Sequence, residues 1–336
     1  MFPEDFSRVA AHLPQAVDLN YFSDRQSPWL LAQSMQPECA VSQLRSGPLA
    51  KLLDRPALRP LVALSGGKLR RRDVQALAYA DALDRIDAAG PAGVAALDAA
   101  WSLPWMDFQL SFTTWGTKRH LWANHQISRP GGNLVIQLAF PSEHERLMAE
   151  YLPDGSRTKF EEEMHPTRKD GRPTLAWSRV DIDFDREEAL IEEVQSDWLR
   201  FVDAEVRWMA ENRSQQRDLR RHRAYQRALM ERYAKIWPEV MLLATLIVVR
   251  DFLGVRRIWM HLPESGAVLK GINGVQPPRS LYTQLPKRFC FAPCQDVPQM
   301  LGARIGCRRV RLQNQRLKAV RSIGRVGKPV FWRLDL

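Results

Sequence analysis

The 336-residue sequence is poor in cysteine and in long apolar runs. Its four cysteines are Cys39, Cys290, Cys294 and Cys307. That number is too small for a disulfide scaffold at this length. The longest mainly apolar run covers residues 240–249, whereas a membrane-spanning helix needs about 20 residues. The opening sequence MFPEDFSRVAAHLPQAVDL also lacks the basic and apolar segments of a secretory signal. We therefore expect a cytoplasmic protein with reduced thiols and no membrane-spanning helix.

Acidic residues are in deficit, since 38 Asp and Glu stand against 49 Lys and Arg, which gives a net charge of +11. Hydrophobic residues (45%) and charged residues (26%) are near globular averages, which excludes wholesale disorder. The basic residues concentrate at 68–72, at 213–232 and in the tail from residue 304. Charge gathered in this way favours nucleic acid or another polyanion as partner. A charge that serves only solubility is the open alternative.

Eight arginines in the second and third basic segments are candidates for phosphate contacts. They are Arg217, Arg220, Arg221, Arg223, Arg227, Arg308, Arg309 and Arg311.

The chain is predicted to have two parts. Residues 1–104 form an Ala/Leu-rich helical region with Pro and Gly between short segments. Residues 105–336 form an α+β domain with a basic helical insertion at 199–235 and a basic, strand-like tail from residue 304. Its sheet is expected to be mixed or mostly antiparallel, with flanking helices. Alternating or apolar runs predict the strands 106–115, 133–141, 174–184, 189–195 and 255–262.

The segment ALIEEVQSDW carries adjacent carboxylates, Glu192 and Glu193, on a predicted strand. Neighbouring side chains on a regular strand point to opposite faces, so one carboxylate is expected in the core and the other in a cleft. The strand then ends in Gln195, Ser196 and Asp197, which gathers polar groups at its exit. The alternative is a solvated sheet face that carries a salt bridge.

The register of the predicted hairpin depends on its turn. With a four-residue loop, Asp183 pairs with Leu190 and Asp181 pairs with Glu192. Like charges placed directly opposite each other need a cation or a raised pKa to coexist. Arg179, on the same face, is the expected cation.

ALIEEVQSDW resembles the "IEEIQSDWH" signature of an uncharacterised module in the polyvalent proteins of phages and conjugative elements. Further segments resemble this module in the same order: PGGNLVIQLAFP, Met164-His165 before LAWSRVDI, WPEVMLLATLIVVRDFLGVRRIWM, and LYTQLPKRF. The resemblance covers roughly residues 130–290. It breaks after Trp198, where the basic helix is inserted, and after Trp259, which lacks a following Thr-Thr-Gly. No established activity comes with the module.

The order of predicted elements is also similar to that of GNAT-like acyltransferases, and LYTQLPKRFCF looks like the close of such domains. This resemblance implies a transferase in which Glu192 or Glu193 is the general base and Tyr282 protonates the departing thiolate. No glycine-rich pyrophosphate loop follows the strand 189–195, so acyl-CoA and another acyl donor both stay open. The candidate catalytic residues are His165, Glu192, Glu193, Gln195, Ser196, Asp197 and Tyr282.

Two alternatives belong to other functional classes. Asp183 with Glu193-Val194-Gln195 is similar to the motif of PD-(D/E)xK nucleases, which hold Mg²⁺, although a β-bulge is needed to place both carboxylates on one face. The second alternative is a non-catalytic nucleic-acid-binding protein whose carboxylates are structural.

Two weaker patterns remain as predictions. Cys290, Cys294 and Cys307 with His261 have the residue types of a zinc site, but ordinary thiols are the simpler interpretation. His120 and His125 lie among tryptophans that are able to stack on bases.

Overall fold

The computed structural model describes residues 1–116, 126–152, 160–162, 165, 167, 171–212, 216–272, 278–302 and 308–336. The predicted α+β class is confirmed. The chain divides into two compact units. The sheet unit comprises residues 1–17, 109–287 and 291–335, and the helical unit comprises residues 18–108, 288–290 and 336. In the described part of the chain, no helix combines the length and apolarity needed to cross a membrane.

The helical unit is made of short helices around a two-stranded sheet. Its helices are α2 (Gln26–Ser34), α3 (Val41–Arg45), α4 (Arg59–Leu64), α5 (Arg71–Ala78), α6 (Leu83–Asp87) and α7 (Pro91–Trp101), with a 3₁₀ turn at Ala50–Leu52. Its sheet pairs β2 (Glu38–Ala40) with β3 (Lys68–Arg70). A Cβ on Gly93 would lie 2.9 Å from the Cα of Asp73, so α7 packs against α5 only because this position is glycine. The Asp73 carboxylate accepts the Gly90 N–H at 2.6 Å and fixes the start of α7.

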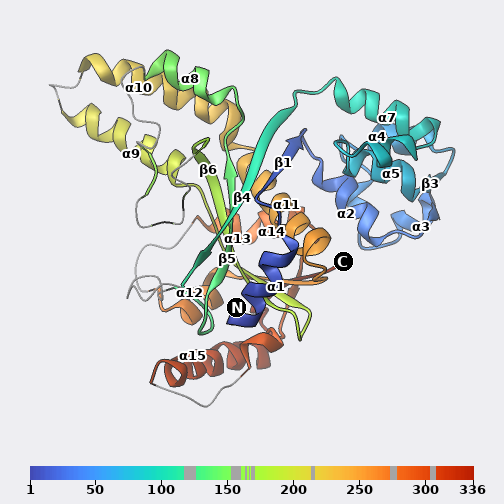
Figure 1. The fold of residues 1–336 in the computed structure, drawn as a ribbon. Helices are drawn as coiled ribbons and strands as arrows, with labels where there is room; N and C mark the ends of the chain where they lie inside the picture. Colours follow the sequence, from blue (N-terminus) through green and yellow to red (C-terminus); the bar gives the residue numbers. More distant parts are fainter. Residues whose placement is uncertain are drawn as a thin grey trace. The chain divides into compact units, whose positions relative to one another are not determined.

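The main sheet has eight strands in the order β1-β4-β5-β6-β7-β8-β10-β9 (Figure 1). They are β1 (Ala16–Tyr21), β4 (Met106–Trp115), β5 (Asn133–Ala139), β6 (Thr174–Asp183), β7 (Glu188–Gln195), β8 (Arg257–His261), β9 (Ala292–Cys294) and β10 (Phe331–Asp335). Neighbours from β4 to β7 are antiparallel, β7 and β8 are parallel, and β10 is antiparallel to both β8 and β9. The sheet is therefore mixed and mostly antiparallel, as predicted.

The two faces of β6 differ in chemistry. Side chains such as Val180 and Ile182 are apolar and lie on the face that packs against α11 (Trp237–Ile247). On this face the Ser178 and Thr245 hydroxyls form a 2.7 Å hydrogen bond, which leaves neither group unsatisfied in the core. Arg179, Asp181 and Asp183 alternate with these residues along β6. They are charged and point to the other face. The polar face carries the candidate site.

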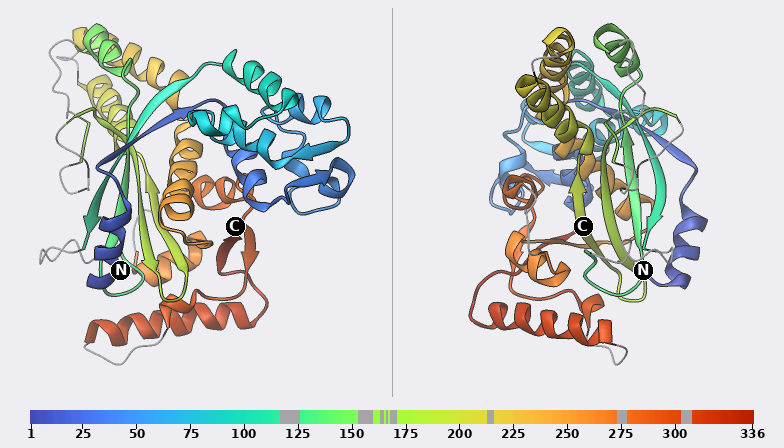
Figure 2. Two further views of the ribbon diagram at one scale, coloured as in Figure 1. Left: turned by 45° about the vertical axis from the view of Figure 1, so that its right-hand side comes forward. Right: turned by 90° about the vertical axis from the view of Figure 1, so that its left-hand side faces the viewer.

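Further helices belong to the sheet unit. They are α1 (Pro3–His12), α8 (His144–Tyr151), α9 (Asp197–Glu211), α10 (Gln216–Leu229), α12 (Pro263–Lys270), α13 (Arg279–Thr283), α14 (Leu285–Arg288) and α15 (Arg308–Arg325). Single π-helical turns extend α10 over Met230–Ala234 and α11 over Val248–Phe252, and a 3₁₀ turn covers Gln299–Leu301. The predicted basic insertion forms α9 and α10, which lie beside α8 in both views of Figure 2.

The strand-like prediction for the tail is wrong over most of its length. Residues Arg308–Arg325 form the 18-residue helix α15, and only Phe331–Asp335 form a strand. Leu317 and Val320 are buried three residues apart, which is helical spacing. The frequent arginines hid this spacing, because a helix with few apolar positions shows a weak periodic signal.

An aromatic cluster joins α8, α9 and α10 to the sheet. The ring of His144 stacks on Phe140 with centroids 3.6 Å apart, and Trp198 meets Phe140 edge-on at 5.3 Å. Tyr225 accepts the Trp198 indole N–H at 2.8 Å and lies 3.2 Å from Nε2 of His144. Burial, together with the charge of Arg232, lowers the pKa of His144 to about 3, so its imidazole is neutral at physiological pH.

His144 should make the folded state sensitive to mild acid. Its pKa is depressed on folding, so the unfolded chain binds more protons below pH 6.5, and stability is lost as the pH falls from 6.5 toward 3. The expected contribution to the loss between pH 6.5 and 5 is about 1.5 kcal/mol. Urea unfolding at the two pH values measures it. The H144Q variant should lose less stability over this interval, and an unchanged pH dependence would contradict the assignment.

Candidate active site

Strand β7 contains a β-bulge at Glu192. Arg179 of β6 lies opposite Glu193, while Val180 lies opposite Ile191, so Glu192 is an extra residue without a partner on β6. The prediction that one carboxylate lies in the core and the other in a cleft agrees with the structure, since Glu192 is fully buried and Glu193 lines the cavity described below. Both carboxylates interact with the same two cations, Arg179 and Lys270.

Glu192 is a fully buried anion. Its carboxylate accepts the backbone N–H and the hydroxyl of Ser128, both at 2.9 Å, and lies 3.0 Å from Nε2 of His261. Burial alone would raise the pKa of Glu192, but the hydrogen bond with His261 and the charges of Lys270 and Arg179 lower it to about 2. Burial also lowers the pKa of His261, which favours the neutral ring that donates its N–H to Glu192.

Glu193 forms an ion pair with Arg179. The same guanidinium donates to the carbonyl of Gln126 at 3.0 Å and lies 5.1 Å from the ring centroid of Trp115. Burial would raise the pKa of Glu193, but Arg179 and Lys270 hold it below its ordinary value. Neither glutamate is therefore suited to accept a proton near neutral pH.

The parallel pairing of β7 with β8 stops before β7 ends. The ladder joins Glu188–Ile191 to Arg257–Met260, while β7 continues to Gln195. A cavity of about 550 Å³ lies where the two strands part. The polar side chains that line it are Gln126, His165, Glu193, Gln195, Ser196, Arg200, His261, Lys270 and Tyr282. Trp237, Leu262, Ile272 and Leu281 supply apolar wall.

Two side chains satisfy the backbone of β7 beyond the ladder. The Nζ of Lys270, at the end of α12, donates to the carbonyl of Glu192. The hydroxyl of Tyr282, on α13, accepts the N–H of Val194 at 3.3 Å. A buried strand edge cannot leave these groups unpaired without a large cost, so Lys270 and Tyr282 replace the missing neighbour strand. They place an ammonium and a phenol on the wall of the cavity.

A histidine–aspartate pair lies at the rim of this cavity. Nδ1 of His165 is 2.7 Å from the carboxylate of Asp197, the first residue of α9. Asp197 also accepts the indole N–H of Trp177 at 2.9 Å and the guanidinium of Arg200 at 2.8 Å, and Gln195 donates to it. Burial would raise the pKa of Asp197, but its hydrogen bond and charge interaction with His165, with the bonds from Trp177 and Gln195, lower it. With Nδ1 bound to Asp197, Nε2 of His165 is the nitrogen left for a ligand.

The structure brings most of the predicted catalytic residues together. Five of them line the cavity: His165, Glu193, Gln195, Ser196 and Tyr282. Asp197 orients His165, and Glu192 lies behind the wall. Ser196 is not a nucleophile in this arrangement, because its hydroxyl donates to the Leu175 carbonyl at 2.6 Å.

Sequence reasoning missed Lys270 and Ser128, and proposed His261 only as a zinc ligand. Lys270 and Ser128 contact Glu192 across 78 and 64 positions of the chain, which no local pattern reveals. Lys270 ends a helix just before Gly271, which has a φ of 67°. A glycine with a positive φ commonly follows the last residue of a helix, so the sequence around Lys270 gives no sign of a functional site.

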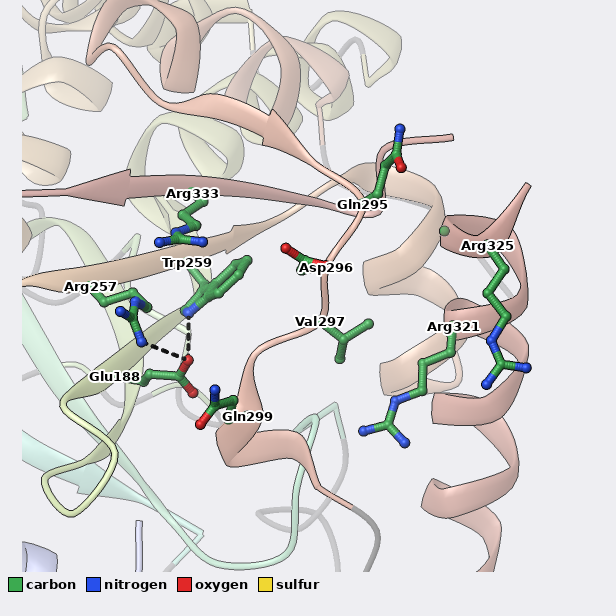
Figure 3. A pocket seen from close by; sticks show the side chains of 11 residues that line it. Glu188, Arg257, Trp259, Gln295, Asp296, Val297, Gln299, Arg321, Arg325 and Arg333 are labelled. Atoms are coloured by element: carbon green, nitrogen blue, oxygen red, sulfur yellow. Dashed lines mark hydrogen bonds and ion pairs between the residues drawn. The ribbon is translucent and has the colours of Figure 1, made fainter. Parts of the chain in front are cut away.

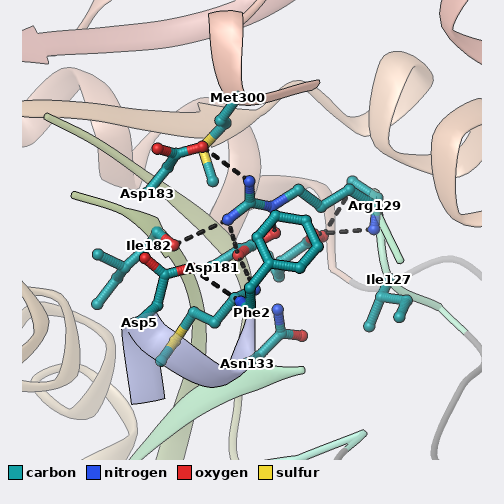
Figure 4. A network of polar contacts seen from close by, with 12 residues as sticks. Phe2, Asp5, Ile127, Arg129, Asn133, Asp181, Ile182, Asp183 and Met300 are labelled. Atoms are coloured by element: carbon teal, nitrogen blue, oxygen red, sulfur yellow. Dashed lines mark hydrogen bonds and ion pairs between the residues drawn. The ribbon is translucent and has the colours of Figure 1, made fainter. Parts of the chain in front are cut away.

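The predicted hairpin register is wrong. Asp183 lies opposite Glu188, and Asp181 lies opposite Leu190, so no pair of aspartate and Glu192 exists. Arg129 neutralises both aspartates, with guanidinium contacts of 2.6 and 2.8 Å to Asp181 and 2.9 Å to Asp183 (Figure 4). The turn has four residues, as assumed, but it lies at 184–187 rather than 185–188, and this shifts the pairing by two positions.

The register also bears on the nuclease alternative. The bulge that it requires is present, but Glu193 lies opposite Arg179, four residues along β6 from Asp183. Four residues of strand span about 13 Å, and Mg²⁺ ligands lie within about 2.1 Å of the ion, so these two carboxylates cannot share one. Among the described residues, no group of three His, Cys, Asp or Glu side chains could hold a metal ion.

Some predicted residues lie outside the described part of the chain. They are Cys307 of the zinc pattern, and His120 and His125. Cys290 and Cys294 are free thiols.

The basic helix α10 has one buried and one exposed face. Its buried residues Leu219, His222, Tyr225 and Leu229 follow helical spacing. The predicted phosphate-contact residues Arg220, Arg221, Arg223 and Arg227 are exposed, and so is Arg311 on α15. The side chains of Arg217, Arg308 and Arg309 lie outside the description.

No protein-family model, curated protein or solved structure matches this chain. Its functional interpretation therefore depends on the chemistry of its own residues.

Removal of the Glu192 carboxylate should destabilise the fold. An E192A variant leaves Ser128, His261 and a nearby Lys270 without their buried anion, which should cost about 3 kcal/mol. Glu211 is an exposed glutamate at the end of α9, so E211A should change stability by less than about 0.5 kcal/mol. Urea unfolding followed by circular dichroism compares the two. Equal midpoints would show that Glu192 is not the buried anchor described above.

Proposed function

We propose that the chain is an acyltransferase with a GNAT-like core, in which the acyl group enters where β7 and β8 part. The observation that carries this proposal is the cavity at that point, which has Tyr282 on its wall and the His165–Asp197 pair at its rim. The proposal also agrees with the order of elements that the sequence shares with GNAT-like acyltransferases. In that family the opening between two such strands receives the acyl donor.

Tyr282 supplies the acid. Burial, with the charge of Glu193, raises the pKa of its phenol, so the group is protonated at neutral pH and able to give its proton to a leaving sulfur. The N–H of Val194 then donates to the phenolate oxygen and stabilises it. Tyr282 is only 4% exposed, so the proton passes directly to the bound group rather than to bulk water.

His165 supplies the base in place of Glu192 or Glu193. Both glutamates are held as anions by cations and hydrogen bonds, whereas His165 is oriented by Asp197 and has Nε2 available. The amine nitrogen forms a bond to the acyl carbon and loses a proton to Nε2 of His165. The carbon–sulfur bond breaks, and the sulfur takes the proton of Tyr282, which is restored from His165 through water.

The junction of β7 and α9 does not fit the pyrophosphate of coenzyme A. Pyrophosphate binding needs free backbone N–H groups at a helix start, usually with glycine. Residues 196–200 have the sequence SDWLR, and the buried carboxylate of Asp197 occupies the first turn of α9. We therefore infer a thioester donor that is not recognised by a pyrophosphate at this helix.

Small thioesters should serve as donors. We expect acyl N-acetylcysteamine thioesters, which carry no phosphate, to reach a kcat/KM within about tenfold of the matching CoA thioesters with a panel of primary amines. Release of free thiol measures the reaction. Y282F and H165Q should each lower kcat by about 10²–10⁴-fold, because each removes one proton-transfer group.

S196A is the matched control, since Ser196 lines the same cavity but its hydroxyl is occupied by the Leu175 carbonyl. It should keep the rate of the unmodified chain within about threefold. Transfer that persists in both Y282F and H165Q would overturn the assignment of acid and base. Absence of thiol release with every thioester would overturn the transferase itself.

The arginine face of α10 favours a substrate associated with nucleic acid or another polyanion. Arg220, Arg223 and Arg227 are exposed on this helix. If these arginines contact phosphates, the variant R220Q/R223Q/R227Q should bind duplex DNA with a weaker dependence on salt. The slope of the logarithm of the association constant against the logarithm of the salt concentration should be shallower by about 2–3.

The control for charge alone is R8Q/R45Q/R59Q, which removes three exposed arginines elsewhere. Equal slopes in both triple variants would mean that α10 has no special part in binding.

A further inference from the structure

A second pocket lies on the same face of the sheet as the proposed cleft but shares no lining residue with it. It has a volume of about 470 Å³ and lies between β8, β10, the segment 295–299 and the end of α15 (Figure 3). A buried apolar cluster that includes Leu190, Leu269 and Leu317 belongs to this same face. The pocket is therefore a separate feature and is not used by the proposed transfer reaction.

The pocket is lined by two carboxylates, Glu188 and Asp296, as well as by arginines. The buried carboxylate of Glu188 accepts the indole N–H of Trp259 at 3.3 Å and the backbone N–H of Met300 at 2.8 Å. Arg257 and Arg333 both reach Asp335, at 3.3 and 2.8 Å. The other two arginines that line the pocket, Arg321 and Arg325, take no part in these contacts.

Arg321 and Arg325 are the two cations without a partner. Neither guanidinium group forms a hydrogen bond or ion pair with any described residue. They are four residues apart on α15, so their side chains lie on one face of the helix, and Figure 3 shows Arg321 extending toward Val297. Two like charges at this spacing repel each other, so the arrangement is unfavourable until an anion joins them.

The position of α15 is fixed at this pocket. A Cβ on Gly324 would overlap the carbonyl of Gln295, so the helix approaches segment 295–299 as closely as glycine permits. Gly324 lies between the two unpaired arginines in sequence. The close contact therefore holds the arginine-bearing turn at the edge of the pocket, with Arg321 half-buried and Arg325 exposed.

We propose that this pocket binds the phosphate monoester of a small molecule, with Arg321 and Arg325 as the ligands of the phosphate. Guanidinium groups bind phosphate through paired N–H donors, and two of them match a dianion in charge. The pocket has the volume of a nucleotide-sized ligand and is recessed, whereas a polynucleotide backbone needs an extended surface. The side chains of Gln295 and Gln299 supply neutral hydrogen-bond groups beside the phosphate.

Calorimetric titration of the full chain with inorganic phosphate at pH 8 tests the site. The unmodified chain should bind phosphate, and R321Q/R325Q should lower the affinity at least tenfold. K318Q/K328Q removes two exposed cations outside the pocket, one on α15 and one just after it, and it should leave the affinity within about twofold. R321K/R325K keeps the charge but loses the paired donors, so its affinity should lie between those of the other two.

Three outcomes would overturn the proposal. They are no heat of binding at 10 mM phosphate, equal affinity in R321Q/R325Q and the unmodified chain, or an equal loss in K318Q/K328Q. A 12-base-pair DNA duplex is titrated in parallel. Duplex binding that is at least a hundredfold tighter than phosphate binding and is lost in R321Q/R325Q would assign the arginines to a polynucleotide instead. The transfer assay does not enter this test, so the two proposals can fail separately.

Discussion

The buried carboxylate of Glu192 holds the polar half of the sheet unit together. It accepts hydrogen bonds from the loop before β5 through Ser128, and it meets His261 at the end of β8. The backbone of the same residue receives Lys270 from α12. One residue thus joins a loop, two strands and a helix. A charge without these partners would be too costly to bury, so the four elements have to assemble around it together.

The bulge that places Glu192 there also shapes the cavity. An extra residue in β7 adds local twist, and the parallel ladder with β8 ends at Ile191. The backbone groups beyond that point are satisfied by Lys270 and Tyr282 rather than by a strand. A requirement of hydrogen bonding therefore explains why a phenol and an ammonium line an opening in the middle of the sheet. The His165–Asp197 pair reaches the same opening because Asp197 begins the helix that follows β7.

The distribution of charge has two origins in the structure. On the sheet, arginines such as Arg129 and Arg179 are buried and paired with carboxylates, so they contribute little to the field outside. On α10 and α15 the arginines are exposed or line a pocket. Part of the excess of +11 thus comes to the surface through these helices. The cavity between the strands carries charges of both signs, Glu193 beside Arg200 and Lys270.

Local patterns were sufficient for the central strands of the main sheet, but not for β1, β2, β3 and β9. The alternation in 106–115 and the apolar runs of 174–184 and 189–195 predict β4, β6 and β7 within a few residues of their observed bounds. The arginine-rich tail was mistaken for strand, because α15 has few apolar positions to show helical spacing. The hairpin register was wrong because the four-residue turn lies at 184–187 rather than 185–188, and neither this offset nor the bulge after it has a marker in the sequence.

By itself, the sequence determined the α+β class, the mixed sheet, and the presence of a polar cluster around Glu192, Gln195 and Asp197. Only the tertiary structure decided which of these groups face the cavity and which are buried anchors. The physical reason is that the bulge reverses side-chain alternation and that the partners of the site, such as Lys270 and His261, are distant in the chain. The pairing of Arg321 and Arg325 with a pocket likewise depends on where α15 packs, which composition alone cannot specify.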